Sequence, residues 1–478
     1  MANSIKANYF YNLVLTLSGM LFPLITFPYI TRVIQAEGVG LVHFYQGIVD
    51  YIVLFSSLGI PVYAIREVAR VRDDIKKRND VLAEILILNI MLSLVAYLFA
   101  FTIGFTVDRI LDNLSIYLVL CVGIILNSIG SGWFYQGIED FKFIAIRGIL
   151  VRFVCLISLF VFVHTKEDLM AYAIISIFGS VGNNIINFLY LRHYVNVSDI
   201  TFKELHPFRH LVPSIRIFAL NLVISIYVNL DSIMLGFLST NAAVGYYTGA
   251  TRLTKTILGV INSLQTTMIP RFSYLATNDT KEKFDTLIQK VFDFVLAVSL
   301  PMAVGLYIMA PTLINLFCGE GYTPAIITLE IISPIILLIS MSGVPCFQIL
   351  YPLGKEKIAI CATAVGAIVN FLLNMLFIPE QAENGAAIAT VVAETSVTVM
   401  MFIFGRKYIN IKKFTPHYLN CIIATILMGA LLYLIKSFDL ANWQNIILMP
   451  LGGVSLYFGY LFLKRDTITD YIKSYIKK

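Results

Sequence analysis

Basic side chains lie inside long apolar stretches of this chain, where an ionised group at the centre of a bilayer costs about 2.5–3.5 kcal/mol. Such residues usually face a water-filled cavity or a charged partner. A guanidinium group can hold phosphate oxygens in a bidentate fork, and a lysine adds a compact positive charge. The pattern therefore suggests binding of an anion such as phosphate by Arg152, Arg216, Arg252 and Lys255. Arg216 has a second interpretation, in which its side chain reaches the lipid headgroups.

Other polar residues follow helical spacing in two of the apolar stretches. His43, Gln46, Asp50 and Ser57 are separated by three, four and seven residues, which places them along one face of a helix. The stretch 243–270 repeats this arrangement with Thr248, Arg252, Lys255, Asn262 and Thr266. A polar stripe of this length along a membrane helix predicts a surface that lines water.

Three carboxylates lie deep in apolar stretches, at Asp50, Asp231 and Glu394. We treat them as candidate coupling sites for a transported proton or sodium ion, because an acid in a partly dry cavity can respond to its surroundings. The alternative is that they neutralise nearby arginines. Glu394 and Arg152 remain equally open to a structural ion pair.

The elements that position these residues are membrane helices, because fourteen apolar stretches are each long enough to cross a hydrocarbon core of about 30 Å. We predict an all-α membrane protein with spans at 8–31, 40–64, 81–105, 115–136, 144–163, 170–191, 211–236, 243–270, 286–310, 323–350, 358–378, 385–405, 416–435 and 444–463. Lysine and arginine between the spans fall almost entirely on one side, except for Arg32, Arg109, Lys166 and Lys436. Basic loops stay cytoplasmic, so both termini are expected there.

Spans seven to twelve weakly repeat spans one to six. Arg66 matches Arg271 at an offset of 205, and Ile144-Ala145 matches Ile358-Ala359 at an offset of 214. Because six is even, both copies would enter the membrane in the same direction, as in parallel-repeat transporters. We expect two six-helix lobes with a cleft between them, at 1–210 and 211–410, and an appended helix pair without a counterpart at 411–478.

Several classes of function are disfavoured. The net charge of +6 lies in loops where membrane insertion explains it, so we expect no nucleic acid. The six cysteines show no paired spacing, and no GxxxxGK[ST] motif is present. The short loops leave no room for a catalytic domain, and we expect neither an enzyme nor a cofactor. Histidines in or near loops, without a nucleophile or metal spacing, are expected to be solvated: His164, His193, His206, His210 and His417.

Three runs of residues resemble bacterial polysaccharide-biosynthesis flippases of the Wzx type. They are Phe22-Pro23-Leu24-Ile25-Thr26-Phe27-Pro28-Tyr29-Ile30-Thr31-Arg32-Val33, Glu37-Gly38-Val39-Gly40-Leu41 and Gly132-Trp133-Phe134-Tyr135-Gln136-Gly137-Ile138-Glu139-Asp140-Phe141-Lys142. Asp231-Ser232-Ile233-Met234-Leu235-Gly236 and Pro352-Leu353-Gly354-Lys355 also look like marks of that family. The resemblance extends to Arg32, which we add to the candidate substrate-binding residues for diphosphate or sugar, and to Asp231. His43, in contrast, stands where a small or apolar residue would be expected.

This resemblance implies the multidrug/oligosaccharidyl-lipid/polysaccharide (MOP) exporter superfamily. It also implies transport of undecaprenyl-diphosphate-linked repeat units of O-antigen or capsule across the bacterial inner membrane by alternating access. A polysaccharide polymerase and a chain-length regulator would then be partners. Two other cargoes stay open, those of a lipid II flippase and of a multidrug or cation antiporter. A polymerase or ligase would need a large outer loop with catalytic residues, and none is visible.

Overall fold

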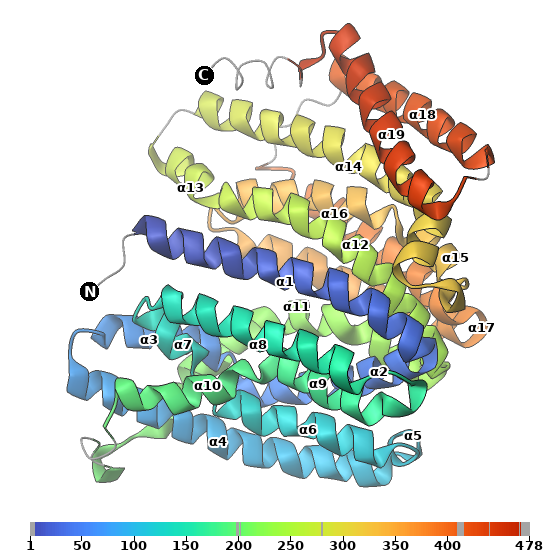
Figure 1. Cartoon of the computed structure of the whole chain (residues 1–478). Helices are drawn as coiled ribbons and strands as arrows, with labels where there is room; N and C mark the ends of the chain where they lie inside the picture. The colour runs from blue at the N-terminus through green and yellow to red at the C-terminus, as the bar shows by residue number, and fades with distance from the viewer. Residues whose placement is uncertain are drawn as a thin grey trace. The chain divides into compact units, whose positions relative to one another are not determined.

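The structure is a computed structural model that describes residues 5–196, 200, 202–278, 281–408, 415–438, 440–467 and 469. The chain divides into two compact units, 1–237 and 238–478. Both consist of helices in the described part of the chain, as the sequence predicts (Figure 1). The predicted boundary at 210/211 was derived from the sequence repeat. A division into compact units does not test a repeat, so this boundary stays a prediction. The boundary at 410/411 lies outside the described residues.

The first unit contains the helices up to α11. They are α1 (Ile5–Val33), α2 (Gln35–Ser57), α3 (Ile60–Val71), α4 (Ile75–Thr106), α5 (Asp108–Leu111), α6 (Leu114–Ser128), α7 (Gly132–Gly137), α8 (Phe141–Phe162), α9 (Leu169–Val181), α10 (Asn183–Tyr190) and α11 (Leu211–Leu238). Several start at a side-chain cap. Asp74 accepts from the Lys77 N–H at the start of α4, and Asp140 accepts from the Phe143 N–H at the start of α8.

The second unit contains α12 (Asn241–Thr267), α13 (Ile269–Asn278), α14 (Lys281–Phe317), α15 (Ala325–Ile332), α16 (Ile335–Gly343), a π-helical turn (Val344–Leu350), α17 (Glu356–Gly405), α18 (Pro416–Ser437) and α19 (Asn442–Leu463). The helices α18 and α19 form an antiparallel pair that packs against α14. Tyr457 of α19 donates a hydrogen bond of 2.8 Å to the Ala297 carbonyl of α14.

Ten helices in the described residues are long and apolar enough to cross a membrane, or eleven if the pair 166–181 and 183–193, bent by 48°, is one span. The protein is therefore a multi-pass membrane protein. All fourteen predicted spans coincide with helices or consecutive helices, but two do not satisfy this test. The polar residues of α12 lower its hydropathy, and the structure describes the side chains of only part of α11. Fourteen spans therefore remain a prediction.

The helix α17 is a hairpin. A straight helix of its 50 residues would be about 75 Å long, more than twice the thickness of a bilayer core. Ala382 has non-helical angles (φ 46, ψ −126), and the Cβ position of Gly385 lies 2.4 Å from the Phe377 carbonyl oxygen. Gly366 likewise faces Val397 and the Ala393 carbonyl. The two arms therefore run antiparallel, where the eleventh and twelfth spans were predicted.

The two units repeat one pattern of helix contacts. In the first unit α2 packs on α4 and α6, and the short α3 packs on α4 and α7. In the second unit α12 packs on α14, α15 and α16, and the short α13 packs on α14 and the π-helical turn. Both short helices begin with Ile-Pro, at Ile60-Pro61 and Ile269-Pro270. This common order supports an internal repeat.

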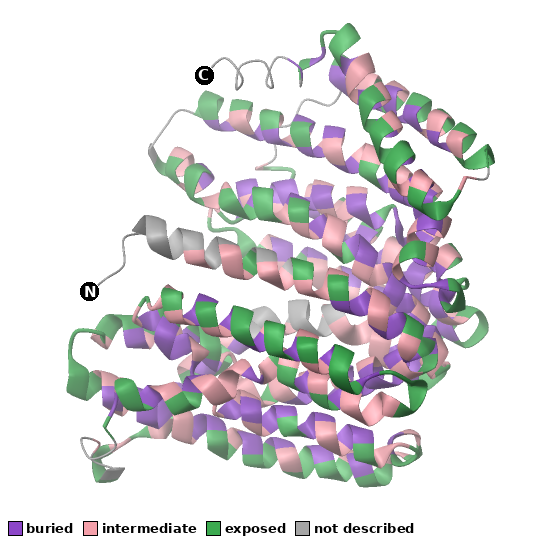
Figure 2. Cartoon of the chain, in the orientation of Figure 1, coloured by how far each residue is buried: buried purple, intermediate pink, exposed green. Residues whose placement is uncertain are grey.

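The outer faces of the helices are apolar. Along α8 the buried residues include Gly148, Val151, Cys155 and Leu159, whereas large side chains such as Phe153 (60% exposed) are exposed. Figure 2 shows buried and exposed residues along the same helices. Small residues inside and large apolar residues outside are typical of helices that pack closely in lipid. The same surface would aggregate in water.

A buried acid fastens the start of α11 to α4. Glu84, 2% exposed, accepts hydrogen bonds from the His206 N–H (2.7 Å) and from His210 Nε2 (2.8 Å), and it pairs with Arg209 (2.5 Å). Tyr63 of α3 lies 2.8 Å from His210 Nδ1. Since Nε2 faces a carboxylate and Nδ1 faces a hydroxyl, a neutral imidazole satisfies both contacts.

We expect Ala382→Gly to raise the melting temperature. Glycine accepts a positive φ without strain, and such a substitution stabilises by about 1 kcal/mol. Thermal unfolding in detergent measures the change. Ala364→Gly, in the regular part of the same helix, should lower the melting temperature by a similar amount, because glycine weakens a helix interior. A decrease for both variants would contradict the strain at Ala382.

We also expect His210 to make the protein sensitive to acid. Burial is the main cause that lowers the pKa of His210, against the opposing effect of Glu84. The unfolded chain then binds the proton more tightly, so stability present above pH of about 6.5 is lost as the pH falls. Melting curves from pH 7.5 to 5 should show a smaller decrease for His210→Gln than for the wild type. The exposed His193→Gln should keep the wild-type profile; equal profiles for all three would refute the assignment.

Candidate functional site

The predicted polar stripe of α2 is present in the structure. His43, Gln46 and Asp50 are all half-buried, and Gln46 Nε2 donates a hydrogen bond of 2.8 Å to Asp50 Oδ1. An i,i+4 pair of this kind keeps both side chains on one face of the helix. The three residues therefore share the face that the spacing predicts.

The outer half of α11 packs against α2 and brings Asp231 to this region. The Cβ position of Gly236 would overlap the Phe44 ring, and Gly47 lies against Ile233, so the two helices run antiparallel. Asp231 is buried and lies within electrostatic reach of Tyr51, the neighbour of Asp50. Two of the three candidate coupling acids, Asp50 and Asp231, thus lie at a similar level on packed helices.

The basic candidates of the first unit are dispersed. Arg152 Nη1 donates to the Leu15 carbonyl (2.9 Å) and to Ser18 Oγ (2.5 Å), which joins α8 to α1. Arg32 is exposed and donates to the Pro28 carbonyl (2.6 Å). Since Leu15 precedes Pro28 by thirteen residues, the two guanidinium groups lie about 20 Å apart along α1.

Arg216 lies on a third helix, α11. It is exposed near the start of this helix, where Gly59, with φ +73, meets the backbone of Ser214 and Phe218. Asp231 lies fifteen residues further along the same helix, or about 22 Å. Arg216 and Asp231 therefore do not pair with each other.

The predicted basic site residues of the second unit, Arg252 and Lys255, lie on α12. The packed face of this helix includes Val244, Tyr247, Leu258 and Ile261, whereas Arg252 and Asn262 are half-buried and Lys255 is exposed. Steps of three and seven residues place Arg252, Lys255 and Asn262 close to one another around the helix. These three residues lie outside the packed face of their unit.

Glu394 lies in the second arm of α17 and is buried, 8% exposed. It follows by one turn Thr390, whose hydroxyl group lies 3.0 Å from Tyr247 of α12. Thr398 donates to the backbone carbonyl of Glu394. The third acid thus belongs to the second unit and lies near the contact between α17 and α12.

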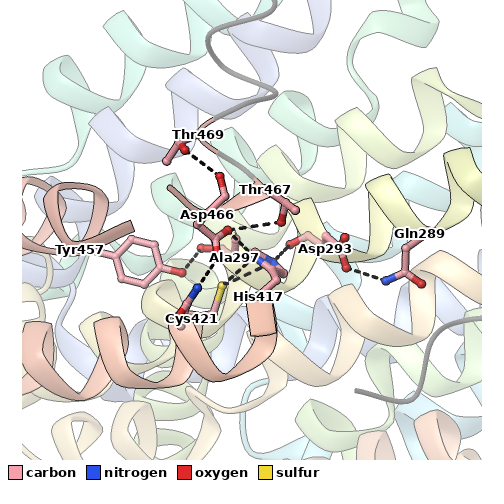
Figure 3. Close-up of polar contacts among 10 residues, drawn as sticks. Gln289, Asp293, Ala297, His417, Cys421, Tyr457, Asp466, Thr467 and Thr469 are labelled. Atoms are coloured by element: carbon pink, nitrogen blue, oxygen red, sulfur yellow. Dashed lines mark hydrogen bonds and ion pairs between the residues drawn. The ribbon is translucent and has the colours of Figure 1, made fainter. Parts of the chain in front are cut away.

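The sequence interpretation missed a polar pocket of about 880 Å³ in the second unit, at the first residues of α14 and α18 and the last residues of α19. At its floor His417 Nδ1 lies 2.5 Å from Asp466 Oδ1, and His417 Nε2 lies 3.1 Å from the Asp293 carbonyl oxygen (Figure 3). Asn420 donates to Asp466 Oδ2, and Gln289 donates to Asp293 Oδ1. Both nitrogens of His417 face acceptors, a geometry that an imidazolium satisfies.

Two histidine predictions were therefore wrong. His210 and His417 are buried, whereas His164, His193 and His206 are exposed as expected. The buried pair have carboxylate partners, Glu84 and Asp466, that are 126 and 49 residues away in the chain. No local spacing signals such a pair.

Arg147 was not among the predicted site residues. It lies in α8, with its guanidinium carbon 5.5 Å from the centre of the Phe143 ring. Its Nε and Nη1 atoms are buried and have no hydrogen-bond partner among the described residues. Arginine over an aromatic face retains favourable electrostatics when it is partly desolvated.

Among the described residues, no group of three His, Cys, Asp or Glu side chains is arranged to hold a metal ion. All six cysteines are free.

Curated relatives are similar over most of the chain. A protein of Escherichia coli K12 named "Putative O-antigen transporter" is 28% identical over 408 residues, covering 84% of this chain and 97% of the relative. A protein of Shigella dysenteriae with the same name is 23% identical, covering 80% and 96%. These relatives carry the names of transporters and not of enzymes.

Solved structures show the fold. The lipid II flippase MurJ in an inward closed conformation has a TM-score of 0.74 at 14% identity, covering 96% of this chain and all of that chain. An inward-facing MATE multidrug transporter of the MOP superfamily has a TM-score of 0.56 at 14% identity, covering 82% and 94%. The chain therefore has the fold of MOP superfamily transporters.

The sequence resemblance described above is confirmed by a family model. The model described as polysaccharide biosynthesis protein matches residues 5–276, which is more than half of the chain. This protein belongs to the polysaccharide biosynthesis protein family.

Proposed function

We propose that this protein is a flippase that moves undecaprenyl-diphosphate-linked oligosaccharide repeat units from the cytoplasmic to the periplasmic leaflet by alternating access. The observation that carries the proposal is the position of Arg252 and Lys255. They lie on α12, a predicted membrane span, away from its packed face, in a chain of the polysaccharide biosynthesis family. A cation within a membrane span raises the free energy of insertion, so it usually has an anionic partner or contacts water.

The physical chemistry suits a lipid diphosphate. A diphosphate with attached sugars cannot cross hydrocarbon unaided, whereas its polyprenyl tail can remain in the lipid. Arg252 would bind phosphate oxygens in a bidentate fork, and Lys255 would add charge on the same side of the helix. Arg32, Arg152 and Arg216 belong to the first unit, and we assign them to other stages of the path. His43, Gln46 and Asn262 would contact sugar hydroxyls or water.

The topology follows from the basic loops, with both termini in the cytoplasm and the protein in the bacterial inner membrane. The released repeat unit would be passed to a polysaccharide polymerase, with a chain-length regulator as a further partner. The likeness to lipid II flippase concerns the fold and does not select the cargo. Basic residues on α12 favour an anionic cargo over the cations of a multidrug antiporter.

Ion coupling is the second part of the proposal. Asp50 and Asp231 lie on packed helices of the first unit, and Glu394 lies in the second. A carboxylate whose surroundings change during transport can take up and release a proton or a sodium ion. We therefore propose that transport is driven by one of these ion gradients.

Charge reversal on α12 tests the cargo site. In a strain that lacks the native gene, Arg252→Glu with Lys255→Glu should reduce surface glycan about 100-fold or more, because two charge-assisted contacts of at least about 1.5 kcal/mol each are lost. Surface glycan and inner-leaflet lipid-linked glycan are both measured. The swap Arg252→Lys with Lys255→Arg should retain part of the export.

The control carries the same change of charge at two exposed lysines, Lys76→Glu with Lys357→Glu, and should export normally. All proteins must be present in the membrane in equal amount. Normal export by the Arg252 and Lys255 variant would defeat the assignment. Accumulation of lipid II in place of the repeat unit, after the gene is deleted, would identify the other cargo.

Flux in proteoliposomes tests the coupling. We expect the wild type to respond to an imposed proton or sodium gradient, and Asp231→Asn and Asp50→Asn to reduce this response to background, since an amide does not bind either ion by charge. The exposed Glu320→Gln serves as the control and should behave as the wild type does. Wild-type flux that is independent of both gradients would exclude coupling.

A further inference from the structure

The pocket at the first residues of α14 and α18 lies at a boundary of the membrane. Lys281 begins one apolar span, Pro416 begins another, and Leu463 ends a third. All three span ends contribute to its lining or lie directly beside it. Its volume of about 880 Å³ can accept the polar headgroup of a lipid.

The two acidic residues at the floor of this pocket, Asp293 and Asp466, are hydrogen-bonded within the protein. Asp466 is 3% exposed and contacts His417 and Asn420, while Asp293 accepts from Gln289. Buried charges of this kind are costly unless they are paired and hydrogen-bonded, and these are. The floor acids therefore have partners within the protein, and a ligand would meet mainly the outer residues.

The outer residues of the pocket are predominantly basic. Lys281, Lys290, Lys464 and Arg465 are exposed, and they are accompanied by two further acids, the exposed Glu282 and the half-buried Asp285. The first backbone N–H groups of α14 and α18 add partial positive charge at the same place. The exposed lining thus favours an anion.

Arg465 is held in an unusual conformation. Its φ of 48° lies in the left-handed region, where a glycine usually ends a helix. The turn is closed by a hydrogen bond of 3.0 Å from the Asp466 N–H to the Leu461 carbonyl, and it directs Asp466 toward His417. Glycine would make the same turn without strain. A strained arginine at this position keeps a guanidinium group at the pocket.

The adjoining surface is apolar. Leu419 and Ile422 of α18 are 48% and 44% exposed, and Phe462 and Leu463 of α19 are 42% and 85% exposed. They directly neighbour Asn420 and Lys464 of the pocket lining in the chain. Acyl chains could therefore lie along α18 and α19 while the phosphate enters the pocket.

We propose that this pocket binds the phosphate group of an anionic phospholipid of the surrounding bilayer, with Lys464 and Arg465 as its principal contacts. Basic pockets between membrane helices bind lipid headgroups in this way, and arginine suits phosphate oxygens. The bound lipid links α14, α18 and α19 at one membrane surface. This site is separate from the proposed cargo residues on α12.

Lipid binding to the purified full-length protein in detergent tests the proposal. Phosphatidylglycerol should bind and raise the melting temperature, whereas phosphatidylcholine and inorganic phosphate at equal concentration should do so much less. Lys464→Gln with Arg465→Gly should weaken phosphatidylglycerol binding about thirtyfold, since each basic residue near an anionic surface contributes about a factor of five. The control, Lys76→Gln with Lys357→Gln, removes two exposed cations elsewhere and should bind normally.

Arg465→Gly alone separates binding from folding. Without lipid its melting temperature should equal or exceed that of the wild type, because the backbone strain is removed, yet it should bind phosphatidylglycerol more weakly. Unchanged phosphatidylglycerol binding in the double variant would overturn the proposal. An equal effect of inorganic phosphate would indicate a free-anion site, and a strong preference for undecaprenyl phosphate would indicate the carrier lipid; either result would also overturn it.

Discussion

A charged side chain inside a membrane protein must have a partner or water, and this constraint accounts for the arrangement of the buried polar groups. Glu84 binds His206, His210 and Arg209, Asp466 binds His417 and Asn420, and Arg152 binds the backbone and Ser18 of α1. Each of these polar groups connects a helix, or the start of a helix, to another helix of the same unit. The polar contacts therefore fix the positions of α1, α11 and α18 within their own units.

The attachments of α11 and α18 are alike. Glu84 of α4 follows Pro61 by 23 residues, and Asp293 of α14 follows Pro270 by the same interval. Each of these acidic residues contacts a buried histidine at the start of a later helix, α11 or α18. Glu84 makes the contact through its carboxylate, and Asp293 makes it through its carbonyl oxygen. The C-terminal helix pair, for which the sequence showed no counterpart, is thus anchored to the second unit as α11 is anchored to the first.

The local sequence pattern predicted the positions of the helices, but contacts between residues far apart in the chain could not be predicted from it. Apolar length located the helices, and helical spacing placed Gln46 and Asp50 on one face, because both depend only on residues nearby. The prediction of a solvated His417 was wrong because its acid, Asp466, follows two helices later in the chain. The residue with the non-helical angles is an alanine, Ala382, and not a glycine, so residue type did not mark the reversal. The gap between the two predicted spans did mark it.

The helix α12 shows why a functional helix departs from the general pattern. Its polar residues reduce its hydropathy below that of the clear membrane spans, and Arg252, Lys255 and Asn262 are not among the residues of its packed face. Arg152, in the first unit, donates two hydrogen bonds to α1, so the packing of its own unit accounts for its position. Arg252 and Lys255 lie outside the packed face of α12, where a membrane helix can meet water or a ligand.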